Sequence, residues 1–367
     1  MAGFLFEMPN GDCAYQYYQC IVVRFNGKRK TVSTAILNGG YREDLTAIFN
    51  HDCNPGAGMA CTLRAPTYKE HLQLVAADLG LTPETTSGLG TAASMDNVSV
   101  QTLVYKDLRV TALVTGGVEV NGGRAGDPAD YYEPLDKQPY QPGTINLFLL
   151  IDADLPAGAL TRAIVTATEA KTAALQELMA GSNYSYGLAT GSGTDGTIAV
   201  ANADSPLYLE GAGKHTKLGE LIGLTVKTAV KEALYKQTGL CGDSQRSCLK
   251  RFKRFGLCEE TIWRDYCNAG GCREKAVFLD ALYRLDCNTE LVMKASLYIH
   301  LADQFLWGLF DAQEIRQETD CLLKALCEQY GVEPSLGEQV PYSVETATRQ
   351  WSLLMAHILL KQLDQAT

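Results

Sequence analysis

The pattern of hydrophobic and polar residues in this 367-residue chain changes part-way along it. In the first two thirds, short β-rich runs are bounded by Gly, Asp or Pro, which is typical of strands that end in turns. We expect strands at 20–25, 31–37, 98–105, 110–115 and 144–151. The pair Asn26-Gly27 suits the positive φ angles of a tight turn, so the first two runs are predicted to form a hairpin.

Apolar residues at helical spacing predict two helices in the same part of the chain, at 156–179 and 216–235. The first begins with a proline, a favourable residue for a first turn. At about 100° per residue, Lys171 projects within about 20° of Leu160, in the middle of the apolar stripe, whereas Glu169 lies on the opposite face. A lysine on the buried face of a helix needs a partner or a function.

After Gly239 the pattern is mostly helical, with helices expected at 247–255, 259–266, 274–285, 290–309, 314–330 and 344–363. Gly falls from 27 to 7 residues across this position, and eight of the 12 cysteines follow it. We therefore predict an α+β fold, with a mixed sheet and packed helices over 1–240, followed by a Cys-rich all-α domain over 241–367.

Composition narrows the classes of function. With 46% hydrophobic and 20% charged residues the chain can bury a normal core, and its net charge of -10 disfavours nucleic acid and anionic lipid as partners. No run reaches the roughly 20 apolar residues that span a bilayer. The first twelve residues lack the basic start of a signal peptide, so we expect a cytoplasmic protein with reduced thiols.

Two familiar motifs are discounted. The GxGxxG string at 191–196 leads into the strand-like run 197–201, whereas a dinucleotide fingerprint opens a helix. The P-loop-like string at 211–216 has His215 after its lysine, where Ser or Thr is required. The eight cysteines after Gly239 are a separate question. They form no CxxC pair, and the alternative to metal ligation is that their thiols are buried on helix faces. We therefore predict no metal site.

Four segments are richer in Gly, Thr, Asn and charged residues than packing requires. Glycine lets a loop approach a ligand closely, and threonine hydroxyls and backbone N–H groups can hold amides or an oxyanion. We expect these segments to surround a polar, concave site. They are 38–40, 114–127, 166–171 and 189–196, the last followed by 214–220.

Strings in and around these segments resemble the adenosylcobinamide amidohydrolase family of corrinoid salvage enzymes. The similarity runs in order over about residues 20–240, and the helical tail lies outside it. The similar stretches are Leu37–Gly40, Phe49–His51, Leu89–Ala93, Val114–Asp127, Gly143–Asn146, Ala167–Ala174, Gly187–Asp195 and Ala212–Glu220.

The resemblance implies an enzyme that hydrolyses adenosylcobinamide to adenosylcobyric acid and 1-aminopropan-2-ol. It implies a role in corrinoid salvage or remodelling, in which the corrinoid is the substrate and no cofactor is needed. The helical tail is interpreted as a module that supports a homodimer or shapes the mouth of the substrate site.

Hydrolysis of an unactivated amide needs an activated nucleophile, oxyanion stabilisation and an acid for the departing amine. His215 is the first candidate for the general base or acid, oriented by Asp195. Asp195 could instead close the 191–196 loop as an Asx turn. Lys171 is expected to stabilise the oxyanion or activate a nucleophile, or else to pair with a buried carboxylate. Glu169 completes the catalytic candidates, although it faces away from Lys171.

Substrate binding is assigned to polar residues that can pair with the amide groups on a corrinoid edge. For Asn38 and Asn121 the alternative is a role in turn geometry. For Thr190 and Thr194 the alternative is an activated nucleophile. His51 is a candidate for contact with the corrinoid or its cobalt, or a structural residue. The substrate-binding candidates are Asn38, Gly39, Gly40, Asn121, Arg124, Asp127, Thr190, Ser192, Thr194 and Lys217.

Two other classes of function stay open at this point. A corrinoid-binding or sensing protein could keep the pocket without turnover. A metallohydrolase could hold zinc through His51, His215 and a carboxylate, although no metal-ligand spacing supports it.

Overall fold

The computed structural model describes residues 3–54, 63–129, 132, 144–333 and 341–364. Two compact units emerge, Met1–Cys241 and Gly242–Thr367. The first combines sheets and helices and the second is helical, which confirms the predicted α+β class. Cys61 and Gly143, the first residue of one family-like stretch, lie outside the described residues.

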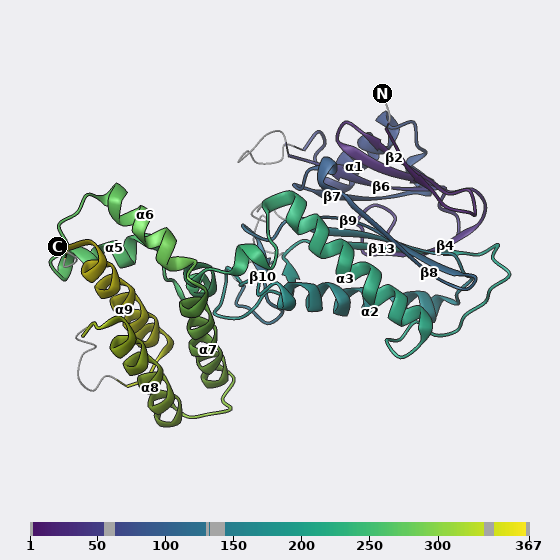
Figure 1. The fold of residues 1–367 in the computed structure, drawn as a ribbon. Coiled ribbons are helices and arrows are strands. Elements are labelled where there is room, and N and C mark those ends of the chain that lie inside the picture. Colours follow the sequence, from purple (N-terminus) through teal and green to yellow (C-terminus); the bar gives the residue numbers. More distant parts are fainter. Residues whose placement is uncertain (1–2, 55–62, 130–131, 133–143, 334–340, 365–367) are drawn as a thin grey trace. The chain divides into compact units, whose positions relative to one another are not determined.

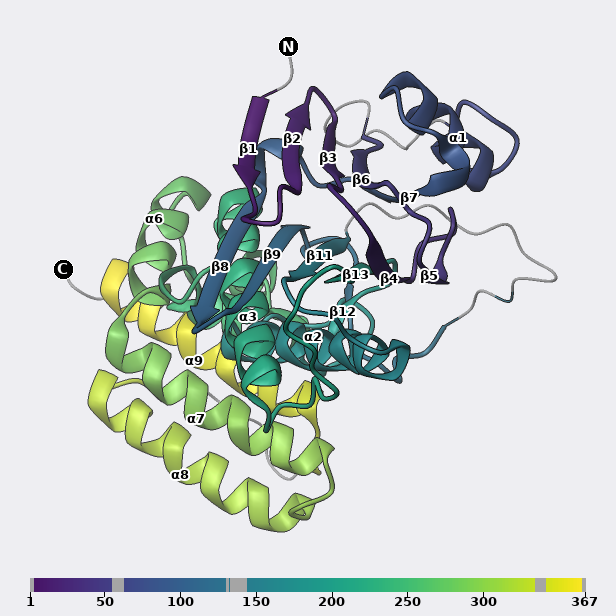
Figure 2. The same cartoon turned by 90° about the vertical axis from the view of Figure 1, so that its right-hand side faces the viewer.

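The N-terminal unit is a stack of four layers, which Figures 1 and 2 show from two sides. The outermost layer is helix α1 (Tyr68–Asp78), and a five-stranded sheet, sheet A, lies beneath it. Neighbours in sheet A are antiparallel except for the last pair, which is parallel. Its strands are, in spatial order, β1 (Gly3–Glu7), β2 (Cys13–Tyr17), β3 (Cys20–Arg24), β6 (Ala47–Asp52) and β7 (Thr86–Thr91).

Sheet B, with six strands, forms the third layer. Its spatial order is β5 (Gly40–Arg42), β4 (Arg29–Ser33), β13 (Gly196–Asn202), β11 (Ile145–Ile151), β9 (Leu108–Gly116) and β8 (Ser99–Tyr105). The strands predicted at 98–105, 110–115 and 144–151 are confirmed as β8, β9 and β11. β11 and β13 are parallel, and the helix α2 (Ala157–Glu177) connects them.

Strand β11 lies between two hydrophobic cores, which explains its uninterrupted apolar sequence. All seven of its residues are buried. Leu147 and Leu149 face the helices, whereas Phe148 and Leu150 join the core between the two sheets. Alternate residues of a strand point to opposite faces, so a strand covered on both sides reads as continuously apolar.

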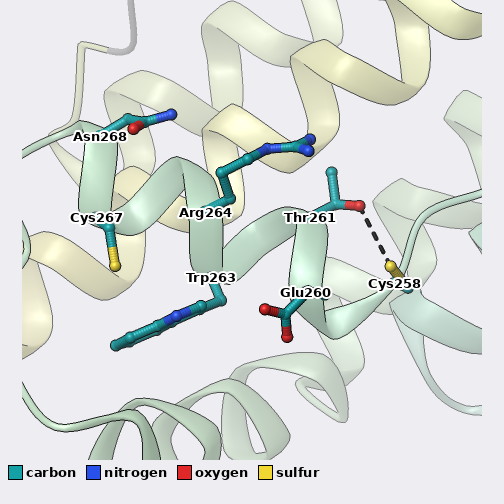
Figure 3. A pocket seen from close by; sticks show the side chains of 7 residues that line it. All are labelled: Cys258, Glu260, Thr261, Trp263, Arg264, Cys267 and Asn268. Carbon is teal, nitrogen blue, oxygen red and sulfur yellow. Dashed lines mark hydrogen bonds between the residues drawn. The ribbon is translucent and has the colours of Figure 1, made fainter.

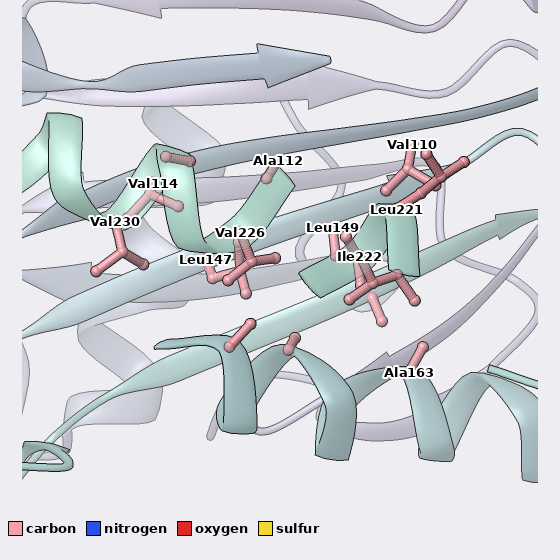
Figure 4. Packing of buried hydrophobic residues seen from close by; sticks show 14 of the residues in the cluster. Val110, Ala112, Val114, Leu147, Leu149, Ala163, Leu221, Ile222, Val226 and Val230 are labelled. Carbon is pink, nitrogen blue, oxygen red and sulfur yellow. The ribbon is translucent and has the colours of Figure 1, made fainter. Parts of the chain in front are cut away.

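The fourth layer consists of α2 and α3 (Lys217–Thr238), the two helices predicted for this unit. In Figure 4, Ile222 and Val226 of α3 lie over Leu147 and Leu149 of β11. Burial of each such side chain contributes about 1.5 to 3 kcal/mol of stabilisation. The packed helices fix the positions of the loops at both ends of sheet B.

The predicted hairpin around Asn26-Gly27 is wrong. β3 pairs with β2 and β6 in sheet A, whereas β4 pairs with β13 and β5 in sheet B, so the chain crosses between sheets at this point. The crossing is fixed by the buried Arg29, whose guanidinium donates to Asp12 at 2.8 Å. Asp12 also accepts from the Asn26 amide at 2.7 Å. A glycine turn serves a corner between sheets as well as a hairpin.

The C-terminal unit contains the helices expected after Gly239. Its core includes the stacked rings of Phe252 and Trp351, whose centroids lie 5.0 Å apart. Among the described residues of the whole chain, no helix is long and apolar enough to cross a membrane. The helices are α4 (Cys248–Phe252), α5 (Glu259–Asn268), α6 (Lys275–Asp286), α7 (Thr289–Leu306), α8 (Ala312–Tyr330) and α9 (Val344–Asp364).

Candidate functional site

An ion pair between Lys171 and Asp195 lies at the amino ends of β11 and β13. Lys171 comes from the last third of α2, and Asp195 immediately precedes β13. Nζ of Lys171 contacts Oδ2 of Asp195, and the two side chains are only 13% and 12% exposed. Lys171, on the apolar stripe of its helix, thus pairs with a buried carboxylate, which was one of the alternatives expected for it.

Three further donors hold the Asp195 carboxylate. Oδ1 accepts from the Ile145 amide at 2.8 Å and from the Ser192 hydroxyl at 2.7 Å, and Oδ2 accepts from the Ser192 amide at 3.0 Å. The bonds from Ser192, three residues earlier, close the loop, although the side chain of an Asx turn would accept from the backbone two residues further on. The carboxylate is positioned by the loop, the start of β11 and the lysine together.

Gly191 is required by the close approach of this pair to the backbone. A Cβ atom at this position would overlap Oδ2 of Asp195 and would lie 2.9 Å from Nζ of Lys171. Any other residue therefore displaces one member of the pair. This glycine of the loop therefore makes room for the buried ion pair.

A two-stranded ribbon brings a second loop to this site. In it, β10 (Gly122–Gly123) pairs with β12 (Gly191–Ser192). The buried Asn121 lies beside Gly193, where a Cβ would be 3.2 Å from its Oδ1, and the same Oδ1 accepts from the Tyr184 hydroxyl at 2.8 Å. The pairing places Asn121 next to the Ser192–Asp195 loop.

Asp127 anchors the loop that follows Asn121. Its Oδ2 accepts from the Arg124 amide at 2.7 Å and from the Ser182 hydroxyl at 2.5 Å. Burial raises the pKa of Asp127, but hydrogen bonds from Ser182 and Ser185 outweigh it, and the net pKa is lowered. The Arg124 guanidinium donates to the Leu188 carbonyl at 3.2 Å. These contacts give Asp127 a structural task beside the expected substrate contact.

The threonine hydroxyls of the loop take part in hydrogen bonds within the site. Oγ1 of Thr190 accepts from the Ala125 amide at 2.9 Å. Oγ1 of Thr194 lies 2.6 Å from Oγ1 of Thr144, at the start of β11. These bonds tie the two loops and the strand together.

His215 does not have the position expected of it. It is exposed in the loop before α3, and no hydrogen bond joins it to Asp195, whose carboxylate is held by other groups. The neighbouring Lys214 pairs with Glu169 at 2.9 Å and lowers the pKa of that exposed carboxyl. The expected orientation of His215 by Asp195 is therefore wrong, and Glu169 faces away from Lys171 as its helical phase indicates.

Lys217 lies at the other end of sheet B. Its Nζ is 4.7 Å from the ring centre of Tyr105, in the hairpin between β8 and β9, and it pairs with Glu220 at 2.6 Å. Asp195 accepts a hydrogen bond from Ile145, which pairs with Gly116 at the end of β9 away from Tyr105. The eight residue steps of that strand correspond to roughly 26 Å. The structure does not bring Lys217 to the Lys171–Asp195 pair.

Asn38 and Gly39 lie in the turn between β4 and β5, and Gly40 is the first residue of β5. The φ angle of Asn38 is 52°, and its side-chain amide donates to the carbonyls of Pro83 at 2.6 Å and Thr86 at 2.7 Å. The amide is thus engaged by the backbone of the segment leading into β7. This geometry favours the turn alternative for Asn38 over substrate binding.

A chain of buried amides between the two sheets was not among the residues predicted from the sequence. Asn146 donates to Asn50 at 2.7 Å and to the Gly90 carbonyl at 3.0 Å, and Asn50 donates to Thr115 at 2.8 Å. Tyr184, beside Asn121, was missed as well. Each asparagine stood in a family-like stretch, and an asparagine inside an apolar strand was the signal that could have identified it.

His51 lies on the opposite side of the two-sheet stack from α3. Its ring faces His71 of α1, with centroids 5.5 Å apart, whereas His215 precedes α3 beyond sheet B. Burial, with a smaller effect of His71, lowers the pKa of His51 to about 4. A zinc ion shared by His51 and His215 is therefore excluded by the layer order.

The C-terminal unit has a pocket of about 550 Å³ beside α5, shown in Figure 3. At the start of this helix the Cys258 thiol lies 3.3 Å from the Thr261 hydroxyl. This hydrogen bond lowers the pKa of Cys258. The lining residues are Cys258, Glu260, Thr261, Trp263, Arg264, Cys267 and Asn268.

Comparison with known proteins identifies the family. Residues 6–242 match the family described as "CbiZ: Adenosylcobinamide amidohydrolase". The chain belongs to this family. The matched range of this amidohydrolase family includes both site loops and ends where the C-terminal unit begins.

Two individual proteins are similar to this member of the CbiZ family. The uncharacterized protein MJ1613 of Methanocaldococcus jannaschii is 36% identical over 230 residues, which cover 59% of this chain and 86% of that protein. The crystal structure of the PH0078 protein from Pyrococcus horikoshii OT3 matches with a TM-score of 0.33 and 13% identity, over 63% of this chain and 83% of that one.

Proposed function

We propose that this protein hydrolyses the amide that joins the aminopropanol arm of adenosylcobinamide to the corrin ring. The products are adenosylcobyric acid and 1-aminopropan-2-ol. The observation that carries the proposal is the Lys171–Asp195 pair, buried within the part of the chain that matches the amidohydrolase family. A corrinoid salvage or remodelling role follows from this substrate.

In this proposal, Lys171 and Asp195 supply the groups that amide hydrolysis needs. Asp195 takes a proton from the attacking water while the bond between the water oxygen and the carbonyl carbon forms. The Lys171 ammonium stabilises the negative charge on the carbonyl oxygen. When the C–N bond breaks, the proton held by Asp195 passes to the departing amine.

Ser192, Asn121 and Tyr184 position these groups. The Ser192 hydroxyl donates to Asp195 and orients the carboxylate. The Tyr184 hydroxyl donates to Oδ1 of Asn121 and orients this side chain beside the Ser192–Asp195 loop, where we place an edge of the corrinoid. These are positioning and binding roles, and a substitution at Asn121 is expected to raise KM more than it lowers kcat.

The test is chromatography of the products formed from adenosylcobinamide. We expect the wild type to release aminopropanol, and Asp195→Asn and Lys171→Met to lower kcat by roughly 100-fold or more. Lys30→Met is the matched control, because Lys30 forms a half-buried ion pair with Asp154 at 2.6 Å in the same unit. The control should keep its activity.

Three results would count against the proposal. Tight binding of adenosylcobinamide by the wild type with no product formed would indicate a corrinoid-binding or sensing protein. Full activity in both folded site variants would show that hydrolysis takes place elsewhere. An equal loss of activity in Lys30→Met would show that the loss in the site variants comes from lowered stability.

A further inference from the structure

A cluster of two histidines and a cysteine lies between sheet A and α1, outside the proposed amidase site. His51 and Cys53 come from β6 and the residue after its end, and His71 comes from α1. One ring nitrogen of each histidine and Sγ of the cysteine all lie within 4.8 Å of one another. Alternation along the strand turns Asn50 toward sheet B and His51 toward α1.

The ring of His51 is oriented as in a metal-binding histidine. Its Nδ1 lies 3.3 Å from the Gln19 carbonyl oxygen and 3.3 Å from Sγ of Cys20. A carbonyl oxygen only accepts, so this contact places the ring proton on Nδ1 and leaves the lone pair on Nε2. A histidine held by its other nitrogen to a carbonyl is the usual arrangement at metal centres.

His71 supplies a second, independent observation. It is 2% exposed, and among the residues that the structure describes its Nε2 has no hydrogen-bond partner. A buried polar nitrogen without a partner is destabilising, by about 1 to 3 kcal/mol for an ordinary group. A cation bound at Nε2 would give this nitrogen a partner.

The second nitrogen of His71 defines what must change on binding. Nδ1 accepts from the Arg64 amide at 3.2 Å, so the neutral ring carries its proton on Nε2. Coordination through Nε2 moves that proton to Nδ1, and the Arg64 amide then has to turn away. Arg64 lies in an irregular segment before α1, outside any helix or strand whose hydrogen bonds would hold its amide.

Gly90 of β7 makes room for the cluster. A Cβ atom there would overlap the Tyr68 hydroxyl oxygen and would lie 3.0 Å from Sγ of Cys53. The hydroxyl and the thiol therefore lie directly over the bare backbone of β7. The Gly90 carbonyl also accepts from Asn146, which links this cluster to the buried amides between the sheets.

We propose that His51, Cys53 and His71 bind one divalent transition-metal ion of the zinc class. Two imidazoles and a thiolate favour Zn²⁺ over Mg²⁺ or Ca²⁺, which prefer oxygen ligands. With bonds of about 2.1 Å to nitrogen and 2.3 Å to sulfur, ligand atoms of a tetrahedral site lie roughly 3.5 Å apart. Because the three ligand atoms lie within 4.8 Å of one another, the cluster contracts by at most about 1.3 Å on binding, and Cys53 releases its proton.

The test uses the full-length reduced protein, treated with a chelator and titrated with Co²⁺ as a spectroscopic probe. We expect one ion to bind per chain with a thiolate-to-cobalt charge-transfer absorption, and Zn²⁺ to displace it. Cys53→Ser should abolish the charge-transfer absorption, and His71→Gln should weaken binding at least tenfold. Cys13→Ser and His300→Gln, which alter a cysteine and a histidine outside the cluster, are the matched controls.

Thermal unfolding gives a readout that does not depend on absorption or activity. Zn²⁺ should raise the Tm of the wild type and both controls, but not that of folded Cys53→Ser. A wild type without thiolate-bound Co²⁺, or a Cys53→Ser variant that binds Co²⁺ with the same spectrum, would overturn the proposal. Neither result bears on the amidase proposal, whose residues lie in other layers of the fold.

Discussion

Lys171 shows how much one side chain depends on both helical phase and a distant loop. The spacing along α2 places it on the buried face, and this much follows from the sequence. Its partner Asp195 is 24 residues further along, beyond a loop, and only the fold brings the two together. His215 stands in a similarly polar string, yet it is exposed. Helical phase predicts that Lys171 is buried but not which residue pairs with it, and no local pattern predicts the exposure of His215, because both depend on tertiary contacts.

The ion pair predicts a non-additive effect on stability. Lys171→Met leaves the Asp195 carboxylate without its cation, so the free energy of unfolding should fall by about 2 to 4 kcal/mol. Asp195→Asn should cost a similar amount. The double variant should lose at least about 1 kcal/mol less than the sum of the single losses, because neither charge is then left unpaired.

Urea unfolding of the four proteins measures this cycle. Additive losses in the single and double variants would mean that the pair does not couple the two residues energetically. The prediction concerns stability and is independent of which substrate the site takes.

Gly191 offers a separate prediction, since its missing side chain admits the ion pair. Gly191→Ala should lower kcat at least tenfold, because the added carbon displaces Asp195 or Lys171. The control is Gly158→Ala in α2, where an added carbon meets no atom within 4 Å. This control should keep its activity and gain about 0.5 to 1 kcal/mol of stability. Steady-state kinetics of both variants measure the two kcat values. Equal values would contradict the requirement for a glycine beside the Lys171–Asp195 pair.

At the scale of elements, strong local patterns predicted the helices and strands, but they did not predict which strands pair with each other. The long apolar periods of α2 and α3 and the apolar run of β11 identified those elements. The glycine turn at Asn26-Gly27 was correct as a turn, but the sequence could not show that β3 and β4 belong to different sheets. What decides between a hairpin and a corner is the buried Arg29–Asp12 contact, and Asp12 precedes both strands.

The start of α5 leads to a prediction about thiol reactivity. The Thr261 hydrogen bond lowers the pKa of Cys258, whereas the hydrogen bond from Cys272 to Asp364 raises the pKa of that thiol. A lower pKa means a larger thiolate fraction near neutral pH, and the thiolate is the nucleophile. Both thiols are exposed, but Cys258 should be alkylated several-fold faster than Cys272. As the pH increases, the labelling rate of Cys258 should begin to rise at a lower pH than that of Cys272.

Iodoacetamide labelling followed by peptide mass spectrometry at pH 6 to 9 measures both rates. Thr261→Val should slow the labelling of Cys258 and leave that of Cys272 unchanged. Equal rates for the two thiols across the pH range would contradict the prediction.

For the whole molecule, the family match and the division into units support a prediction about truncation. The match ends at residue 242, and the first compact unit ends at Cys241. A chain of residues 1–241 should therefore fold alone and hydrolyse adenosylcobinamide with roughly the kcat of the full chain. Circular dichroism and product chromatography test this expectation. A folded but inactive fragment would show that the helical unit contributes to the site.

The pairing of β4 with β13 has a consequence for the order of events during synthesis. Arg29 at the start of β4 bonds to Asn202 at the end of β13, across 173 positions of sequence. At about 5 to 20 residues per second, a ribosome needs roughly 9 to 35 seconds to supply the second strand after the first. Sheet A can assemble during this interval, since its last strand ends at Thr91, while β4 waits with an open edge. The nascent chain is thus most prone to aggregation before β13 leaves the exit tunnel.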